Sequence, residues 1–553
     1  MTELKTPLEM LHRWENTTPN DVFLRQSLGD GSWQEYTWQD VGDKVRRITQ
    51  FIHSLNLPDK SKIALWSCNS ADWILVDLAI MLSGHISVPL YPGQSKKSTK
   101  FILSECDISL MFIGACGQEE HINDIVPPTI TTVAMFGCTI KTNESLLEIY
   151  SDFPPYTASY LPEQNDLFTI VYSSGTTSDP KGVMHTHGTV GAVTPGTAKS
   201  LRMETYSGNN SEQRARLFSF LPLSHMAERA AIEFTGLYTN ACISFSAGIE
   251  SFQQEIMSVQ PTFFFAVPRL WVKFKASVDA KIPPAAQPSL TDADKHQIRE
   301  MLGLSKAKVI ITGSAPLAAD IHNWFLDMGI VLREAYGLTE TFATGTIWLK
   351  DDEPIAGSVG TAGSNDVEVK LSAQNEVLIR GKGIMAGYYK NEQKTRESLN
   401  NGWFHTGDLG DLDNMGNLTI KGRIGEEFKT SKGKFIHPAP IENKFKSLKQ
   451  LDQFIVIGQG LAQPVLIGTI SELGQQLSEN ALTSTLLDAL KEINNTLPQY
   501  EQVSHIMLSS TPWTIENGLL TPTLKLQRKT IETYYYSDVC EHITGQSVVQ
   551  LSI

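Results

Sequence analysis

A run of small polar residues followed by one lysine, within TIVYSSGTTSDPKGVMHTHG (residues 169–188), is the first pattern in the sequence that could do chemistry. Hydroxyl and backbone amide donors beside a compact positive charge are suited to holding a polyphosphate. The residues that would supply them are Ser173, Ser174, Gly175, Thr176, Thr177 and Lys181. The spacing is not that of a Walker phosphate loop, because Lys181 follows Pro180 and Gly182 stands where a metal-binding hydroxyl is needed. A P-loop ATPase is therefore disfavoured, and the segment by itself is also typical of an ordinary surface turn.

Alternating helical and strand-like segments must position this loop. Short β-rich runs lie between longer segments with helical spacing, such as residues 318–328, and this alternation predicts α/β layers. The β-rich runs include residues 168–172, 262–267 and 308–312. From Val367 the pattern changes to strands and glycine turns, and the runs FIVIGQG and VLIGTI further on indicate a separate α/β unit. We predict a large N-terminal domain (1–423) of layered α/β subdomains plus a small β-subdomain, followed by a small mobile α/β C-terminal domain (424–553).

Length and charge narrow the class of protein. The chain has 553 residues, more than the roughly 250 to 300 at which one hydrophobic core stops growing, so at least two domains are expected. It carries 46 basic and 60 acidic residues, and the net charge of -14 would repel a nucleic-acid backbone, so we expect no nucleic-acid partner. The six cysteines lack the close sequence pairs typical of metal sites or disulfide frameworks, which favours a reducing compartment.

No segment indicates export or insertion into a membrane. The N-terminus lacks the apolar core of a secretory signal, so we expect a cytoplasmic protein. The longest apolar run, residues 73–82, is interrupted by Asp77 and is far shorter than the roughly 20 residues that span a bilayer. We expect this run to form a buried helix. Any membrane contact is expected to be peripheral, because no basic amphipathic anchor is evident.

Seven further segments accompany the candidate phosphate loop. They are LPLSHMAER (221–229), PTFFFAVPRLW (261–271), GSAPL (313–317), EAYGLTET (334–341), GWFHTGDLG (402–410), GRIGEEFKTSKGKFIHPAPIEN (422–443) and LTPTLKLQRK (520–529). Together and in this order, the segments resemble the motifs of the adenylate-forming enzymes, and within them the long-chain fatty-acid CoA ligases. Each segment alone has an ordinary structural explanation, whereas eight in order across nearly the whole chain are not a chance arrangement.

The resemblance implies a reaction in two halves. A carboxylate is a poor electrophile, so enzymes of this family first transfer it to the α-phosphorus of ATP, which expels pyrophosphate and leaves an acyl-adenylate. The thiol of CoA then attacks the activated carbonyl and releases AMP. The first step brings an anion to an anionic phosphorus, so its catalysis is largely positioning and cationic stabilisation.

Several residues are implied to hold the triphosphate. The loop at 173–177 and Lys181 would embrace the β- and γ-phosphates, and Thr339 would contact the α-phosphate. Glu340 would bind Mg²⁺, a hard cation that prefers oxygen ligands and bridges phosphate oxygens.

The nucleoside is implied to lie against a second set of residues. Tyr336 would stack on adenine, while Asp408 and Arg423 would bind the ribose hydroxyls as acceptor and donor. The residues that would wall the base and the activated carbonyl are Gly313, Ser314, Glu334, Ala335 and Gly337.

The acid and the thiol are implied to meet the remaining residues. His225 would border the substrate carboxylate, where we assign it to positioning and not to proton transfer. Lys525 is the strongest catalytic candidate, because its ammonium group suits the oxygens shared between the carboxylate and the α-phosphate. After a rotation of the small domain, Lys432, Gly433 and Lys434 would face the channel of the CoA pantetheine, where a glycine permits close approach to the backbone.

Gly425 departs from the family pattern. Family members usually carry Asp or Lys here, at the residue about which the small domain turns, and glycine permits rotation without a fixed side-chain contact. We hypothesise that Gly425→Pro traps one domain arrangement, so that it spares one half-reaction and impairs the other. The proline in KFIHPAPIE, where relatives often carry glutamate, is a second departure and bears on the thiol channel.

The substrate is expected to be a medium- to long-chain fatty acid, and residues 263–265 would line or support an apolar tunnel. Within the family, the alternative is a ligase that stops at the acyl-adenylate or passes the acyl group to a carrier protein. An alternative of another class is a lipid-binding protein that keeps the fold without the chemistry. The sequence does not indicate the oligomeric state.

Overall fold

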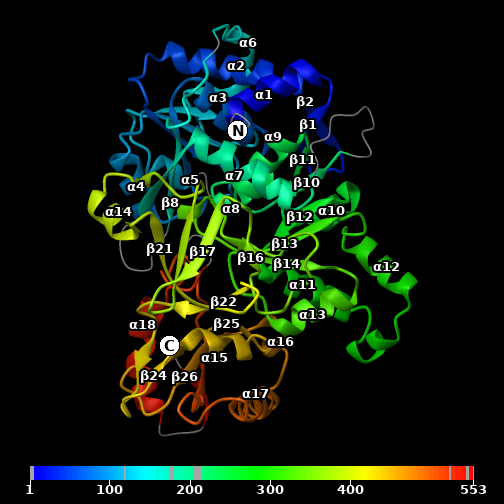
Figure 1. Cartoon of the computed structure of the whole chain (residues 1–553), viewed down its shortest axis with the longest axis vertical. Helices are drawn as coiled ribbons and strands as arrows, with labels where there is room; N and C mark the ends of the chain where they lie inside the picture. The colour runs from blue at the N-terminus through cyan, green and yellow to red at the C-terminus, as the bar shows by residue number, and fades with distance from the viewer. Residues whose placement is uncertain are drawn as a thin grey trace.

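The computed structural model describes residues 5–117, 120–158, 160–173, 180–203, 214–521, 525–543 and 547–551. Figure 1 shows a large upper body, a band of long strands that includes β17 (Val367–Leu371) and β21 (Trp403–Leu412), and a smaller body below that contains the C-terminus. The α/β class, the large N-terminal domain and the smaller C-terminal domain are as predicted. Within the described residues, no helix combines the length and the apolar character that crossing a bilayer requires.

An eight-stranded sheet in the order β19-β9-β8-β4-β3-β5-β6-β7 carries the candidate phosphate loop. Its strands are β3 (Lys62–Trp66), β4 (Ile86–Leu90), β5 (Leu110–Ile113), β6 (Thr131–Ala134), β7 (Glu144–Ser145), β8 (Leu167–Ser173), β9 (Lys181–Thr186) and β19 (Gly387–Tyr388). Strand β8 confirms the predicted strand at 168–172. It pairs antiparallel with β9, so that Ser173 lies opposite Lys181 at the two ends of the loop.

The predicted buried helix is α3 (Ala71–Leu82), and all of its residues are buried. The charge that interrupts its sequence has a partner, because Asp77 Oδ2 lies 2.5 Å from Arg229 Nη2. Arg229 also lies 3.1 Å from Glu233, and all three side chains are almost fully buried. A buried charge needs such pairing, since an isolated one costs several kcal/mol.

A nine-stranded sheet in the order β16-β15-β14-β13-β12-β10-β11-β1-β2 forms the second layer. Its strands are β1 (Val22–Ser27), β2 (Trp33–Thr37), β10 (Arg216–Ser219), β11 (Cys242–Phe245), β12 (Phe263–Ala266), β13 (Val309–Thr312), β14 (Leu332–Tyr336), β15 (Thr346–Ile347) and β16 (Thr361–Ala362). The neighbours β12, β13 and β14 are parallel, so their carboxyl ends meet at one edge. Strands β12 and β13 and helix α13 (Ala319–Asp327) confirm three sequence predictions.

The aromatic run at 263–265 is entirely buried, with at most 5% of any side chain exposed. Phe263 and Phe265 belong to the main hydrophobic core, and Phe264 belongs to a second core that contains Trp271 and Phe325. Consecutive side chains of a strand point to opposite faces, which explains this division. The division favours the interpretation of the run as core structure.

An antiparallel sheet of β17, β18 (Glu376–Gly381), β20 (Leu399–Asn400), β21 and β22 (Leu418–Arg423) forms the predicted β-subdomain. The last body contains a four-stranded sheet and a hairpin. Their strands are β23 (Phe428–Lys429), β24 (Phe435–Ile436), β25 (Leu451–Ile457), β26 (Val465–Ile470), β27 (His505–Ser509) and β28 (Val548–Leu551). The core of the β-subdomain ends at Ile420 and that of the last body begins at Phe428. The predicted boundary after Arg423 lies between these two cores.

Helices cover the sheets. The longer ones are α1 (Pro7–Thr17), α2 (Trp38–Ser54), α4 (Lys96–Glu105), α7 (His187–Ser200), α11 (Pro268–Asp279), α12 (Asp292–Met301), α15 (Pro438–Phe445), α17 (Glu479–Asn494) and α18 (Arg528–His542). Polar contacts fix the small body against the large one. Lys446 Nζ donates to the Pro316 carbonyl at 3.2 Å, and Lys449 Nζ lies 2.7 Å from Asp279 Oδ2.

Candidate active site

The carboxyl ends of β13 and β14 bring the predicted nucleotide-binding segments together. The GSAPL segment follows β13, and Tyr336 ends β14. A Cβ added to Gly313 would lie 3.1 Å from the Ala335 carbonyl oxygen, and one added to Gly337 would lie 2.5 Å from the backbone of Ala343. These close approaches explain the glycines. Ser314 has φ +67° and is exposed at the same edge.

Glu334 is buried and ties two loops to this edge. Its carboxylate accepts hydrogen bonds from the backbone N–H groups of Leu317 at 3.4 Å and Gly357 at 3.3 Å. Burial raises the pKa of Glu334 to about 7. Glu334 therefore supports the GSAPL segment through hydrogen bonds. This contact lies next to the predicted wall of the adenine and carbonyl sites.

Tyr336, Asp408 and Arg423 form one hydrogen-bonded group. The Tyr336 hydroxyl donates to Asp408 Oδ2 at 2.6 Å, and Arg423 Nε lies 2.9 Å from Asp408 Oδ1. Asp408 and Arg423 are cross-strand partners of β21 and β22, which sets their distance. Burial raises the pKa of Asp408, although the charge of Arg423 opposes this rise. The group offers acceptor and donor atoms side by side, as recognition of two hydroxyls requires.

Thr339 and Glu340 lie in a short 3₁₀ helix, η4 (Thr339–Thr341), that is anchored on three sides. The Met385 N–H donates to the Glu340 carbonyl at 2.8 Å, and the Tyr388 hydroxyl donates to Glu340 Oε1 at 2.8 Å. His185 Nε2 donates to the Thr339 carbonyl at 2.7 Å. Burial lowers the pKa of His185 to about 4, so this histidine is neutral at pH 7.

Lys525 reaches the same cleft from the small body. Its side chain stays accessible to solvent but is closely surrounded by protein, and this desolvation lowers its pKa. Arg423 lowers the pKa further, whereas Asp408 and Glu340 oppose the shift. These interactions indicate that the lysine lies within electrostatic range of Arg423, Asp408 and Glu340. Lys525 therefore lies near the residues predicted to bind the ribose and the metal ion.

His225 borders the cleft as well, since the charge of Lys525 contributes to its pKa shift. Burial is the main cause and lowers the pKa of His225 to about 3. Nδ1 accepts a hydrogen bond from the Ala227 N–H at 3.1 Å, which leaves the ring proton on Nε2. Tyr91 lies edge-on to the ring at a centroid distance of 6.3 Å. A neutral donor fits the predicted positioning role and not that of a base.

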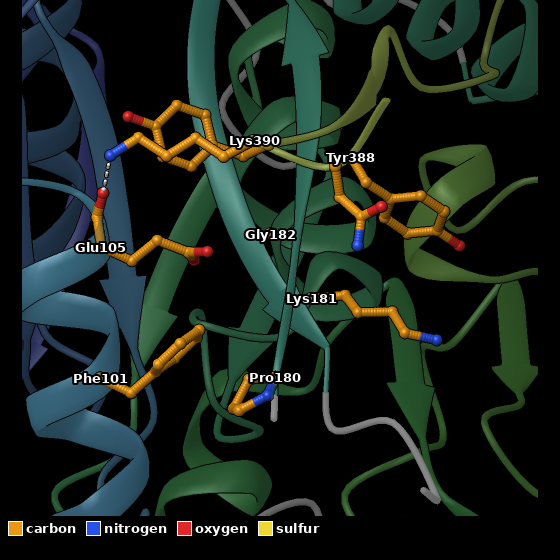
Figure 2. Close-up of a pocket in the computed structure, with 9 residues that line it drawn as sticks. Phe101, Glu105, Pro180, Lys181, Gly182, Tyr388 and Lys390 are labelled. Atoms are coloured by element: carbon orange, nitrogen blue, oxygen red, sulfur yellow. Dashed lines mark hydrogen bonds between the residues drawn. The ribbon is translucent and has the colours of Figure 1, made fainter. Parts of the chain in front are cut away.

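Lys181 lies at the end of the candidate phosphate loop. Burial lowers its pKa, Lys394 adds to this effect, and Glu340 opposes it. A cavity of about 240 Å³ adjoins it and is also lined by Glu105 and Tyr388. Figure 2 shows the Lys181 side chain directed toward the side of Tyr388 and away from Phe101 and Glu105. Ser174, Gly175, Thr176 and Thr177 lie outside the described residues.

The predicted thiol segment is not brought to this cleft. Lys432, Gly433 and Lys434 belong to the hairpin of β23 and β24, which Figure 1 shows in the small body, on the far side of β22 from β14. Gly433 has φ +76°, as its turn requires. The segment and Lys525 both lie after β22, in the part of the chain that forms the small body. The sequence analysis expects this segment to face the cleft only after a rotation of the small domain.

Three supporting residues were missed by sequence reasoning. Tyr388 holds Glu340, and Asn69 and Glu228 hold the loop before His225. Asn69 Nδ2 donates to Ser219 Oγ at 2.8 Å, and Ser219 Oγ donates to Glu228 Oε1 at 2.9 Å. Glu228 lies within a segment that the sequence analysis singled out, whereas no local pattern marks Tyr388.

Comparisons with known proteins agree with this geometry. Residues 11–389 match the family model described as AMP-binding enzyme, and residues 427–544 match the AMP-binding enzyme C-terminal domain. The chain belongs to the AMP-binding enzyme family. It is 25% identical to the long-chain-fatty-acid–CoA ligase FadD15 of Mycobacterium bovis, with 96% of each chain covered. It is 26% identical to long chain acyl-CoA synthetase 4 of Arabidopsis thaliana, over 95% of this chain and 89% of that protein.

Solved structures show the same fold at lower identity. The adenylation domain of a carboxylate reductase from Mycobacterium chelonae superimposes with a TM-score of 0.81 at 18% identity, over 98% of this chain and 91% of that one. The o-succinylbenzoate CoA synthetase of Bacillus subtilis, in complex with its acyl-adenylate intermediate, gives a TM-score of 0.76 at 18% identity, over 96% and 98% of the two chains.

Proposed function

We propose that this protein is an AMP-forming fatty acid–CoA ligase that activates a medium- to long-chain fatty acid with ATP and transfers the acyl group to CoA. The observation that supports this most strongly is the convergence of Lys525, Glu340, Asp408 and Arg423 on one cleft from both domains. The names of the relatives supply the substrate class.

In the first half-reaction, the cleft binds ATP and the fatty acid in line. Asp408 and Arg423 hold the ribose, and Lys181 with the loop at 173–177 holds the outer phosphates. His225 donates from Nε2 toward the substrate carboxylate. Lys525 stabilises the negative charge that accumulates between the carboxylate and the α-phosphate, and the partly desolvated surroundings strengthen this interaction.

Mg²⁺ fits the residues present as a partner of the substrate phosphates. One oxygen of Glu340 accepts from Tyr388, and the carboxylate retains further acceptor capacity for a cation. No cluster of three or more His, Cys, Asp or Glu suited to a metal occurs among the described residues. Mg²⁺ is often held by one or two carboxylates plus phosphates and water, and it neutralises phosphate charge when bound.

In the second half-reaction, we propose that the small domain rotates at Gly425 and presents the hairpin segment at 432–434 to the CoA thiol. Gly425 supports this role because it has φ +81° and no atom lies within 4 Å of the position of an added Cβ. A cytoplasmic location, with peripheral contact with a membrane at the most, belongs to the same proposal.

The test is mass spectrometry of the products formed from ATP, Mg²⁺, CoA and a graded set of fatty acids. The proposal predicts acyl-CoA and AMP, with a chain-length optimum, and their loss in the Lys525→Ala variant. Acyl-adenylate without acyl-CoA would instead support a ligase that uses another acceptor. Fatty-acid binding without consumption of ATP would support the lipid-binding alternative.

A further inference from the structure

Two cysteines that are far apart in the sequence meet at one edge of the eight-stranded sheet. Cys68 follows β3 and Cys116 follows β5, and these strands are parallel neighbours with Trp66 opposite Ile113. The Cys68 N–H donates to the Ala115 carbonyl at 3.0 Å and lies 3.1 Å from Cys116 Sγ. The two cysteines are 48 positions apart in the sequence, and the parallel pairing of β3 with β5 places them side by side.

The geometry suits a disulfide. From standard backbone dimensions, an Sγ in hydrogen-bond contact with the Cys68 N–H lies about 4 Å from the Cys68 Cα. A disulfide requires Cα atoms roughly 4.4–6.8 Å apart, and an Sγ at this position limits the separation of the two Cα atoms to at most about 7 Å. The strand ends are also closely packed, since a Cβ added to Gly114 would lie 2.1 Å from Ser67 Oγ.

The two thiols differ in access. Cys68 is exposed, and Cys116 is half-buried. A third cysteine, Cys138, follows β6 and packs with Cys116 against the same apolar cluster, where its Sγ contacts the Ile140 carbonyl at 3.7 Å. A small oxidant therefore reaches the Cys68 thiol more easily, and the Cys116 thiol is close enough to react with the modified Cys68.

We propose that Cys68 and Cys116 form a redox modification site that reacts with low-molecular-weight disulfides. The Cys68 thiolate attacks the small disulfide, forms a mixed disulfide and releases one small thiol. The Cys116 thiolate then attacks the Cys68 sulfur, forms the protein disulfide and releases the second small thiol. The protein loses two electrons and two protons, and the small disulfide gains both.

The site lies next to a residue that holds the proposed acid-binding loop. Asn69 follows Cys68, donates to Ser219 Oγ at 2.8 Å and accepts from the Leu223 N–H at 2.9 Å. This loop leads directly to His225. Fixing the Cys68 backbone in a disulfide therefore acts on the position of Asn69. This effect on activity rests on the proposed function, whereas formation of the disulfide does not.

The first experiment treats the purified full-length protein with oxidised glutathione and records its intact mass and its non-reduced peptide map. We expect the loss of two hydrogens and a linked peptide pair that contains Cys68 and Cys116. Cys540→Ser, which replaces an exposed cysteine in the small body, is the matched control and should behave as wild type. Cys68→Ser and Cys116→Ser should instead retain a glutathione adduct on the remaining cysteine.

Absence of the linked pair in wild type, or a Cys116–Cys138 link in its place, would overturn the proposal. Thermal unfolding verifies that each serine variant is folded, and Cys68→Ala provides a second variant of the exposed position. A trivalent arsenical, which requires two adjacent thiols, gives an independent measurement. The arsenical should bind the wild type and the Cys540→Ser variant, and it should not bind the Cys68→Ser or the Cys116→Ser variant.

The effect on activity is measured on the same oxidised samples. We expect the KM for the fatty acid to rise about three- to tenfold, the effect of about one net hydrogen bond, and to recover with dithiothreitol. Cys68→Ser should show no such change. If untreated protein has no ligase activity, the proposed function is wrong. The linked peptide still shows whether Cys68 and Cys116 form a disulfide. A disulfide that leaves KM unchanged would refute the link through Asn69.

Discussion

Replacing Gly425 by alanine should slow adenylation more than thioester formation. Gly425 has φ +81°, and its N–H donates to Glu427 Oε2 at 2.8 Å. We propose that this conformation belongs to the domain arrangement that presents Lys525 for adenylation. Because no atom lies within 4 Å of an added Cβ, the substitution causes no steric clash and acts through backbone strain alone. Any domain arrangement in which residue 425 has a negative φ is relieved of this strain.

The magnitude follows from the backbone. A left-handed conformation costs a non-glycine residue about 1–2 kcal/mol, which shifts the equilibrium between arrangements by about 5- to 30-fold. Adenylation should fall by up to this factor. Gly425→Pro should have a larger effect in the same direction. Proline is restricted to φ near −65°, and it lacks the N–H that donates a hydrogen bond to Glu427. The structure thus gives a direction to the sequence-based hypothesis on this substitution.

The assay measures the two half-reactions separately, as ATP–pyrophosphate exchange and as acyl-CoA formation from preformed acyl-adenylate. Gly416→Ala is a matched control, because Gly416 has φ +83° and equally open surroundings but lies in the turn between β21 and β22. The reasoning is refuted if both half-reactions of Gly425→Ala fall equally, or if Gly416→Ala produces the same imbalance.

Three further predictions test single contacts. Lys525→Met should lower the rate of adenylation about 10²- to 10³-fold and spare thioester formation from preformed acyl-adenylate. The wild-type adenylation rate should decline as the pH rises through the pKa of Lys525, which lies below the ordinary 10.5. An equal loss in both half-reactions would contradict this role. Tyr388→Phe should raise the Mg²⁺ concentration needed for half-maximal adenylation about 10- to 100-fold, whereas Tyr389→Phe should not. Burial raises the pKa of Glu228 from 4.5 to about 8, so the folded protein keeps a proton that the unfolded chain loses, and stability falls between these pH values by up to about 1.4 kcal/mol per pH unit. Urea unfolding should show a smaller decline over this range for Glu228→Gln, and an unchanged decline would contradict the assignment.

Local sequence predicted the elements that carry the site because their signals are local. The apolar run at 73–82 is helical and the β-rich run at 168–172 is a strand, since periodicity and side-chain type decide both. The paired charge of Asp77 could not be predicted in this way. Its partner, Arg229, is distant in the sequence and reaches it only because η2 (Arg229–Phe234) packs against α3.

The site shows the same division. The ordered motifs named Lys525, Tyr336 and Asp408 as parts of one reaction, since each chemical role requires a particular residue type. The hydrogen bond from Tyr336 to Asp408 depends on how the β-subdomain packs against β14, which no local pattern encodes.

The sequence by itself determined the family of this protein, the residue types of its chemistry and the strands and helices that carry them. Only the tertiary structure decided that Lys525 lies near Asp408 and Arg423, which residues support Glu340 and the loop before His225, and that Cys68 meets Cys116. These features depend on contacts between segments far apart in the chain, and such contacts are set by strand order and by the packing of whole domains.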